Sequence, residues 1–540
     1  MHSTPEHGSR PLAMHWLILA AYPAMFLYSR NASEFPPEVM IVPVLVTMLC
    51  AMEVWGVLSL LLRNTLKAAL ITSLALVLVF FYGHAVALIG NPHFYISGVH
   101  IGHHKILLPL MSGLLLVGAA WVIFTRRKLY TLTKVLNVAA GILALIATAT
   151  TVAAKVSDGK GMVVATYQAP DAPPQPPVRP APDIYYIILD GYGRADTLSD
   201  LYGFDNEPFL DALRAKGFYV ADRAAANYPQ TALSLACSLN MEYLDRLSET
   251  VGKEKRDHLP LRHAIADSSL LRFLKARGYK SVAYDSGAEV TPRRGMDVWL
   301  SQGPDLGEFG QALLETTPVP VFMRDFKRYD VHRRTVLHTL DTLPDLAATN
   351  SPKFVLAHVL CPHPPFVFDE TGKAITPSRP FSADDGSAYM ALRGASRIEY
   401  VEGYRKQVRF INARILPAVD ALIKNSPTPP IIIIQGDHGP GSMLNWESLE
   451  GSNIPERMGI LSAYYLPAIG QTAPPRLPDD ISPVNTFRCV LRHYFQAEMD
   501  PLPDRSFFST AARPYDFIDV TGRLKRPAPI ESAPPEPATE

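Results

Sequence analysis

The first 154 residues contain five long apolar runs, and this pattern limits what the chain can fold into. The runs lie near residues 12–29, 39–62, 68–90, 106–124 and 135–154. Several of them reach about 20 residues with almost no charge, which is the length of a helix that crosses a bilayer. A signal peptide would account for one run at most. The sequence therefore predicts an N-terminal five-helix transmembrane bundle over residues 1–155.

Positive charge is concentrated in two of the short loops between these runs. The loop between the second and third runs holds Arg63 and Lys67. The loop between the fourth and fifth runs holds a larger basic cluster: Arg126, Arg127, Lys128 and Lys134. Because basic loops stay in the cytoplasm, the N-terminus is expected inside and everything after residue 155 outside. We thus expect a multi-pass protein of a bacterial cytoplasmic (inner) membrane, with a periplasmic or extracellular domain.

The rest of the chain divides into a linker, a second domain and a tail. Residues 156–182 include the stretch "PDAPPQPPVRPAP" and are expected to form a semi-rigid Pro-rich linker. Residues 183–515 alternate apolar strand patterns with helix patterns, and residues 516–540 are Pro-rich and expected to be disordered. The 51 basic and 51 acidic residues balance, so the charge gives no indication of nucleic-acid binding.

Two strand patterns of the second domain end in residue types that are common metal ligands. "DIYYIILD" ends in Asp190, and "PPIIIIQGDHGPGS" places Asp437 and His438 after four isoleucines. The alternation of strands and helices predicts an α/β domain with a mainly parallel central sheet, covered by helices on both faces. Ligands bind beyond the carboxyl ends of such strands. Carboxylate and imidazole together suit a divalent metal, whereas either motif alone is equally compatible with an ordinary turn.

A hydroxyl residue and a histidine are candidates for the chemistry beside this metal. Thr231 opens the apolar helical pattern "TALSLACSLNMEYL", and a metal next to a hydroxyl makes it a nucleophile. The alternative is that Thr231 caps the helix. In "LAHVLCPHPPFVFD", His363 is predicted to hydrogen-bond a substrate phosphate or to protonate a leaving group, and His358 to be structural within the sheet.

Asp190, Thr231, and Asp437 with His438, in this order, resemble the metal site of the alkaline phosphatase superfamily. Membrane spans followed by such a domain are similar to the lipoteichoic acid synthases and the lipid A phosphoethanolamine transferases. "TALSLACS" and "PHPPF" look like the nucleophile and substrate-histidine segments of the phosphoethanolamine enzymes, and "ERMGILSAYYLP" and "SPVNTFR" look like late segments of sulfatase-type membrane transferases.

The resemblance implies an alkaline phosphatase/sulfatase-like fold over residues 183–515 and one divalent metal ion. Its ligands would be four residues: Asp190, Thr231, Asp437 and His438. Zinc or manganese is favoured because imidazole is a ligand, and magnesium or calcium is also compatible. Formylglycine sulfatases need a Cys or Ser in a CxPxR-like context, and the "SLNM" after Cys237 argues against that chemistry.

The function implied is a membrane-anchored phosphotransferase. It would move a phospholipid-derived headgroup, phosphoethanolamine or phosphoglycerol, to an envelope glycan or lipid through a phospho-threonine intermediate. Thr231 would be the nucleophile and His363 would bind the substrate. The alternatives are a membrane-tethered phosphoric or sulfuric ester hydrolase of the same superfamily and a non-catalytic scaffold in envelope assembly.

Overall fold

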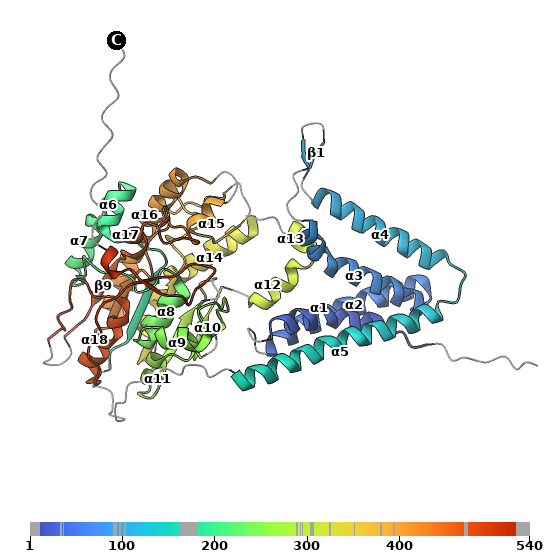
Figure 1. The fold of residues 1–540 in the computed structure, drawn as a ribbon, viewed down its shortest axis with the longest axis horizontal. Coiled ribbons are helices and arrows are strands. Elements are labelled where there is room, and N and C mark those ends of the chain that lie inside the picture. Colours follow the sequence, from blue (N-terminus) through green and yellow to red (C-terminus); the bar gives the residue numbers. More distant parts are fainter. Residues whose placement is uncertain are drawn as a thin grey trace, which may run out of the picture. The chain divides into compact units, whose positions relative to one another are not determined.

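The computed structural model divides the chain into two compact units (Figure 1). One unit comprises residues 1–162 and 304–324, and the other comprises 163–303 and 325–540. The structure describes residues 11–524 with these gaps: 33–34, 36, 90–93, 97–98, 102–103, 162–180, 288–289, 292, 294, 303–306, 323–325, 350–351, 378–380, 392–394 and 469–472. Most of the predicted linker and the tail from residue 525 lie outside the described residues.

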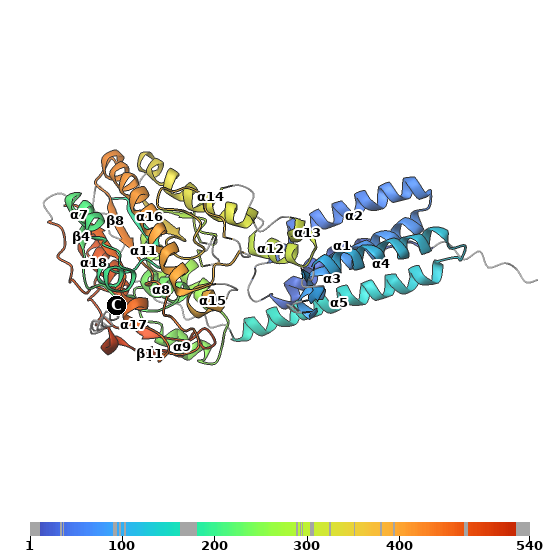
Figure 2. The same cartoon turned by 90° about the horizontal axis from the view of Figure 1, so that it is seen from above.

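The first unit is a bundle of apolar helices (Figure 2). Its elements are α1 (His15–Arg30), η1 (Pro37–Met40), α2 (Ile41–Leu62), α3 (Thr65–Ile89), the hairpin β1 (Phe94–Ile96) and β2 (Val99–Ile101), α4 (His104–Phe124) and α5 (Tyr130–Gly161). Their lipid-compatible surfaces expose large apolar side chains, among them Leu60, Val117 and Phe124. Such exposure is expected of helices whose solvent is hydrocarbon.

Four of these helices are long and apolar enough to cross a membrane, among the residues that the structure describes. The candidate spans are Pro37–Leu62, Thr65–Val86, Ile106–Phe124 and Tyr130–Ala153. The first predicted run forms α1, which has 16 residues. At about 1.5 Å per residue it is about 24 Å long, less than the ~30 Å hydrocarbon core. Five spans are therefore not shown, although α1 packs within the bundle through buried Ala20 and Ala24.

A segment from the middle of the second domain also belongs to the first unit. Residues 304–324 form α12 (Gly307–Glu315) and α13 (Val319–Phe322), which group with the apolar helices. This grouping was not predicted, because the segment lies inside the range expected to be one continuous domain. Residues 183–515 are thus interrupted by an excursion to the bundle.

The second unit is built on a seven-stranded sheet. Its strand order is β4-β9-β8-β3-β7-β5-β6. The strands are β3 (Ile184–Leu189), β4 (Tyr219–Val220), β5 (Lys280–Tyr284), β6 (Val298–Leu300), β7 (Lys353–Val359), β8 (Ile431–Gln435) and β9 (Ser462–Tyr465). β9 pairs antiparallel with both of its neighbours, and the other four pairings are parallel. The prediction of a mainly parallel sheet is confirmed.

Helices cover both faces of this sheet, as the alternation of patterns predicted. The β-branched and aromatic residues of β3 are all buried and alternate between two hydrophobic cores. One core is completed by α8 (Thr231–Asn240), α10 (Leu259–Ala266), α11 (Ser269–Lys275) and α18 (Pro483–Phe495). The other is completed by α6 (Ala195–Tyr202), α7 (Glu207–Ala215), α14 (Phe326–Thr342) and α16 (Arg397–Asn425).

Shorter elements complete the second unit and shift two expected boundaries. They are α9 (Asp245–Val251), η2 (Leu343–Ala348), α15 (Gly386–Ala391), α17 (Ile454–Met458), β10 (Phe507–Phe508), β11 (Ile518–Asp519) and η3 (Thr521–Arg523). β11 pairs with β10, so ordered structure continues beyond residue 516, where the tail was expected to begin. At the other boundary, α5 extends to Gly161, inside the range expected as linker.

Candidate active site

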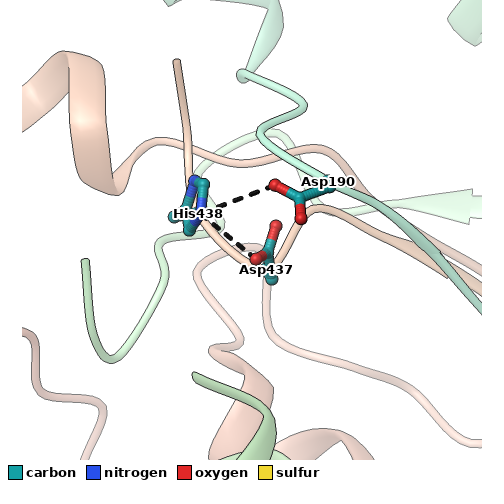
Figure 3. A group of neighbouring side chains, drawn as sticks. All are labelled: Asp190, Asp437 and His438. Atoms are coloured by element: carbon teal, nitrogen blue, oxygen red, sulfur yellow. Dashed lines mark ion pairs between the residues drawn. The ribbon is translucent and has the colours of Figure 1, made fainter. Parts of the chain in front are cut away.

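Three buried side chains that can bind a metal meet at the carboxyl edge of the sheet (Figure 3). Asp190 follows β3 directly, and Asp437 and His438 follow β8. Since β3 and β8 are parallel neighbours, their carboxyl ends bring the three residues together. One ligand atom from each lies within 4.8 Å of the others. His438 Nε2 is 3.6 Å from Asp190 Oδ1 and 3.2 Å from Asp437 Oδ2.

Each carboxylate leaves one oxygen available to a cation. Asp190 accepts a hydrogen bond on Oδ2 from His358 Nε2 at 2.9 Å, and Asp437 accepts one on Oδ1 from Gly191 N at 3.0 Å. Among the described residues, no hydrogen-bond donor reaches Asp190 Oδ1 or Asp437 Oδ2, although both atoms are buried. A buried carboxylate oxygen without a partner costs free energy unless a cation binds it. The residues present therefore fit a divalent metal ion.

The protonation states also suit metal binding. His438 Nδ1 donates to the Gly439 carbonyl at 3.0 Å, which leaves the Nε2 lone pair facing the carboxylates. Burial lowers the pKa of His438, and Arg457 lowers it further, so the neutral ring is favoured. Burial raises the pKa of Asp190, but the neighbouring histidines, first His363, outweigh this effect and the net shift is downward. Both groups are therefore in the form that binds a metal.

Thr231 lies beside this cluster as the first residue of α8. Its Oγ1 is 3.1 Å from His438 Nε2, and because Nδ1 carries the ring proton, the hydroxyl donates to Nε2. The N-cap position belongs to Gln230, so the alternative in which Thr231 caps the helix is wrong. One turn later, Ser234 Oγ donates to the Asp437 carbonyl at 2.7 Å and fixes α8 to the loop after β8. Helix geometry leaves the N–H groups of a first turn without intrahelical acceptors, so those of α8 can serve as donors for an anion.

His363 lies in the loop that follows β7 and is also brought to the cluster. Its Nδ1 donates to the Pro364 carbonyl at 2.7 Å. Its Nε2 is 4.0 Å from Asp190 Oδ1 and 3.8 Å from Asp385 Oδ2. Burial lowers the pKa of His363, but the two carboxylates outweigh it and the net shift is upward. His363 can therefore hold a proton within reach of the metal-binding group.

Asp385 and Arg457 surround the site, and sequence reasoning missed both. The fully buried Arg457 guanidinium contacts Asp385 Oδ2 at 2.5 Å through Nη1. It also donates to the Gly439 carbonyl at 3.0 Å through Nη1 and to the Pro229 carbonyl at 2.8 Å through Nε. Asp385 accepts a further hydrogen bond from Tyr400 Oη at 2.6 Å. Arg457 thus links the chain entering α8 to the loop after β8.

His358 contacts Asp190, and sequence reasoning missed this contact as well. It is fully buried in β7, as predicted for a residue inside the sheet. Its Nε2 bonds Asp190, and its Nδ1 lies 3.1 Å from Thr291 Oγ1. His358 therefore orients the Asp190 carboxylate. The strand register pairs His358 with Ile188, two residues before Asp190. This register would indicate the contact with Asp190, but it is known only when β3 and β7 are known to be neighbours.

Cys237 lies away from this chemistry. Its side chain is fully buried in the α8 core, and burial raises the pKa of its thiol well above the ordinary value. A buried, protonated thiol is inert. The structure thus agrees with the sequence argument that Cys237 is not the reactive residue of a formylglycine enzyme.

The family of the chain follows from its sequence over this same unit. The model of the sulfatase family matches residues 182–472, more than half of the chain, and the chain belongs to that family. All five residues discussed as ligands or reactive groups lie within the matched range: Asp190, Thr231, His363, Asp437 and His438. A comparison with curated protein sequences finds no match.

Solved structures similar to this chain include a periplasmic domain and an integral membrane transferase. The C-terminal periplasmic domain of EcEptC from Escherichia coli is 12% identical and has a TM-score of 0.38, with 64% of this chain and 93% of that one covered. A second structure of that domain is a complex with Zn. The integral membrane lipooligosaccharide phosphoethanolamine transferase A from Neisseria meningitidis is 12% identical with a TM-score of 0.38, covering 89% and 95% of the two chains.

Proposed function

We propose that the chain is a metal-dependent, membrane-anchored phosphotransferase that transfers a phospholipid-derived headgroup through a covalent phospho-threonine. One observation carries this proposal: Thr231 Oγ1 lies 3.1 Å from His438 Nε2, beside two buried carboxylate oxygens that no donor of the described residues reaches. A hydroxyl held against a metal-binding cluster is the arrangement expected of an activated nucleophile. The headgroup would be phosphoethanolamine or phosphoglycerol, and the acceptor an envelope glycan or lipid.

The metal would be held by Asp190, Asp437 and His438, with Thr231 as a fourth ligand. A divalent ion bound there supplies Lewis-acid chemistry, because it lowers the pKa of a neighbouring hydroxyl and offsets charge on a phosphate. Zinc or manganese suits the imidazole ligand better than magnesium or calcium does. His358 holds the Asp190 carboxylate in place through its 2.9 Å hydrogen bond.

In the first half-reaction, Thr231 Oγ1 attacks the phosphorus of the donor lipid. The Thr231 hydroxyl gives up its proton to solvent, the bond from phosphorus to the diacylglycerol oxygen breaks, and His363 Nε2 protonates the leaving oxygen. The N–H groups at the start of α8 bind the phosphate oxygens. Diacylglycerol departs, and the headgroup phosphate remains as an ester of Thr231.

In the second half-reaction, the acceptor hydroxyl attacks the phospho-threonine. His363, now neutral, takes the acceptor's proton, and the Thr231 oxygen leaves and regains a proton from solvent. The enzyme returns to its starting state. If water takes the place of the acceptor, the same residues make the chain a hydrolase. Product analysis with a labelled phospholipid and no added acceptor separates the two reactions.

We also propose that α1 is a fifth span and that the sulfatase-family unit is external. The support is the position of the basic residues, which lie in the α2–α3 and α4–α5 loops. These loops place the residues after α5 outside whether or not α1 crosses the membrane. Only the location of the N-terminus distinguishes five spans from four. A tag with a protease site at residue 1 should be protected in intact cells. Its cleavage would show that α1 is not a span.

The covalent step is tested by mass spectrometry of the full-length protein after a single turnover with phospholipid. We expect an adduct on Thr231 whose mass identifies the headgroup. Thr231→Ala should lose both the adduct and diacylglycerol release while keeping its metal, and Thr231→Ser should retain part of both. Ser238→Ala, a change on the same helix away from the cluster, is the matched control. Release of diacylglycerol by Thr231→Ala at the wild-type rate would end the covalent proposal.

A further inference from the structure

The excursion of residues 304–324 makes an apolar contact with the bundle. The Phe309 ring on α12 lies 6.3 Å from the Tyr28 ring and 5.6 Å from the Phe35 ring, both edge-on. Leu313, one turn further along α12, is buried in the same hydrophobic cluster. Aromatic and apolar side chains of the excursion therefore pack on the end of α1.

A backbone contact fixes the excursion to α3 as well. Gly83 N donates to the Thr316 carbonyl at 2.8 Å. A Cβ on Gly83 would lie 2.4 Å from the Glu315 carbonyl oxygen, a distance that real Cβ atoms do not show. Glycine is thus required for the two backbones to approach this closely. The chain thus has a glycine at the point where the backbones of α3 and the excursion come into contact.

This contact lies at the edge of the apolar layer that the bundle defines. Gly83 is three residues before the end of the candidate span Thr65–Val86. At about 1.5 Å per residue, the contact is about 5 Å inside the apolar boundary. It is also at the opposite end of α3 from Lys67, whose loop carries the positive charge. The excursion therefore meets the bundle at the boundary remote from the basic loops.

One side of α13 packs against the bundle and the other is exposed and apolar. Val321 packs with Tyr82, Ala85 and Leu107 at the ends of α3 and α4. Its neighbour Phe322 is 72% exposed, and Val319 is 39% exposed. The segment "TTPVPVF" from residue 316 to 322 carries no charge. An exposed phenylalanine continuous with lipid-facing helices has hydrocarbon and headgroups as its natural surroundings.

We propose that α13 inserts into the interfacial layer of the membrane and that its partner is the phospholipid surface. The excursion, called the hook below, would then hold the segment between β6 and α14 at the boundary of the lipid layer. The argument uses the bundle contacts and the exposure of Phe322, and it holds whatever reaction Thr231 carries out. Phe322 and Val319 would lie among headgroups and upper acyl chains, while Phe309 and Leu313 fix the hook to α1.

The test places a fluorescent nitrobenzoxadiazole label on Phe322→Cys in the full-length protein, reconstituted in phosphatidylcholine–phosphatidylglycerol vesicles. Cys50→Ser and Cys489→Ser remove the cysteines that are not buried. The matched control is Ile398→Cys on α16, which is 73% exposed in the other unit. We expect the label at 322 to emit at shorter wavelength and to be quenched by doxyl-labelled lipid, and the label at 398 to be quenched by aqueous iodide.

A second variant keeps the test informative if labelling disturbs the hook. Gly83→Val should displace Thr316 from α3 and transfer the 322 label from lipid quenching to iodide quenching. Quenching of the 322 label by iodide with Gly83 intact would overturn the proposal. Protection from both quenchers would also overturn it, because protein rather than lipid would then cover Phe322. Elution of each variant as a single folded species in size-exclusion chromatography shows that the comparison is valid.

Discussion

The bundle and the sulfatase-family unit place their apolar and polar groups in opposite ways. The bundle exposes large apolar side chains, such as Leu60 at 81%, whereas the four isoleucines of β8 are completely buried. The sulfatase-family unit in turn buries ionisable groups, including Asp190 and Asp437. Apolar surface avoids water, so the exposed apolar side chains of the bundle are those expected of candidate membrane spans, and the buried isoleucines of β8 are those expected of a domain in water. The exception within the second unit is its buried charge, and the candidate metal ligands Asp190 and Asp437 belong to it.

The largest expected effect comes from removing a buried charge at the metal-binding edge. Asp437→Ala should empty the site of metal and lower turnover by more than about 100-fold, because even the outer partners of metal ligands are worth about 10–100-fold. Elemental analysis of the purified protein and single-turnover release of diacylglycerol check this. Full metal occupancy in this variant would show that the ligand assignment is wrong.

Asp183 provides the matched control at the amino end of β3, the parallel neighbour of the strand that Asp437 follows. It precedes β3, is buried, and pairs with Lys353. Asp183→Asn removes the carboxylate charge that pairs with the buried Lys353 ammonium, which should cost about 3–5 kcal/mol of stability. Metal content per folded molecule should be unchanged. Equal loss of metal in both variants would mean that global unfolding, not ligand removal, explains the first result.

One substitution in each unit compares how an exposed apolar position of α4 and one of α16 tolerate a charge. Leu116 on α4 is 70% exposed and Ile398 on α16 is 73% exposed. Leu116→Arg should disfavour membrane insertion by about 3–4 kcal/mol, because it lies near the middle of the candidate span. Ile398→Arg should change stability by less than about 0.5 kcal/mol. Membrane fractionation and melting temperatures measure the difference, and equal tolerance at both positions would contradict the lipid-facing assignment of α4.

A smaller effect is expected from a buried histidine outside the metal-binding group. Burial, followed by His363 and Arg333, lowers the pKa of His332 to about 4. As the pH falls from 6.5 toward 4, the unfolded chain takes up a proton that the folded unit refuses. Stability should therefore fall over this range by up to about 3 kcal/mol and be fully present above it. Denaturant titrations of wild type and His332→Phe check this, and identical pH dependence would exclude His332 as the cause.

Local patterns were sufficient for the strands that carry the site. Runs of β-branched and aromatic residues identified β3, β7 and β8, and the parallel arrangement explained why Asp190 and Asp437 should converge. The ends of neighbouring parallel strands meet by topology, so no knowledge of side-chain packing was needed. The assignment of roles to these residues remains a prediction, because geometry alone does not report a reaction.

Long-range packing accounts for what the sequence did not reveal. Arg457 contacts Asp385, which is 72 positions away in the chain, and no local sequence pattern predicts that the two residues meet. The excursion of 304–324 was not predicted because it is assigned to the bundle by contacts with residues distant in the sequence, among them Tyr28 and Gly83. The length of α1 also depended on context, since apolar residues from position 12 continued the run without belonging to the helix.

The excursion has a practical consequence for preparing this protein. A soluble fragment beginning at residue 183 would keep α12 and α13 but lose α1 and α3, on which they rest. Phe309 and Leu313, buried in the full chain at 2% and 6% exposure, would then face water. Newly exposed apolar side chains promote self-association, so such a fragment should aggregate or require detergent. The double substitution Phe309→Ser and Leu313→Ser should reduce this self-association. It removes the exposed apolar side chains and does not change the sheet or its carboxyl edge.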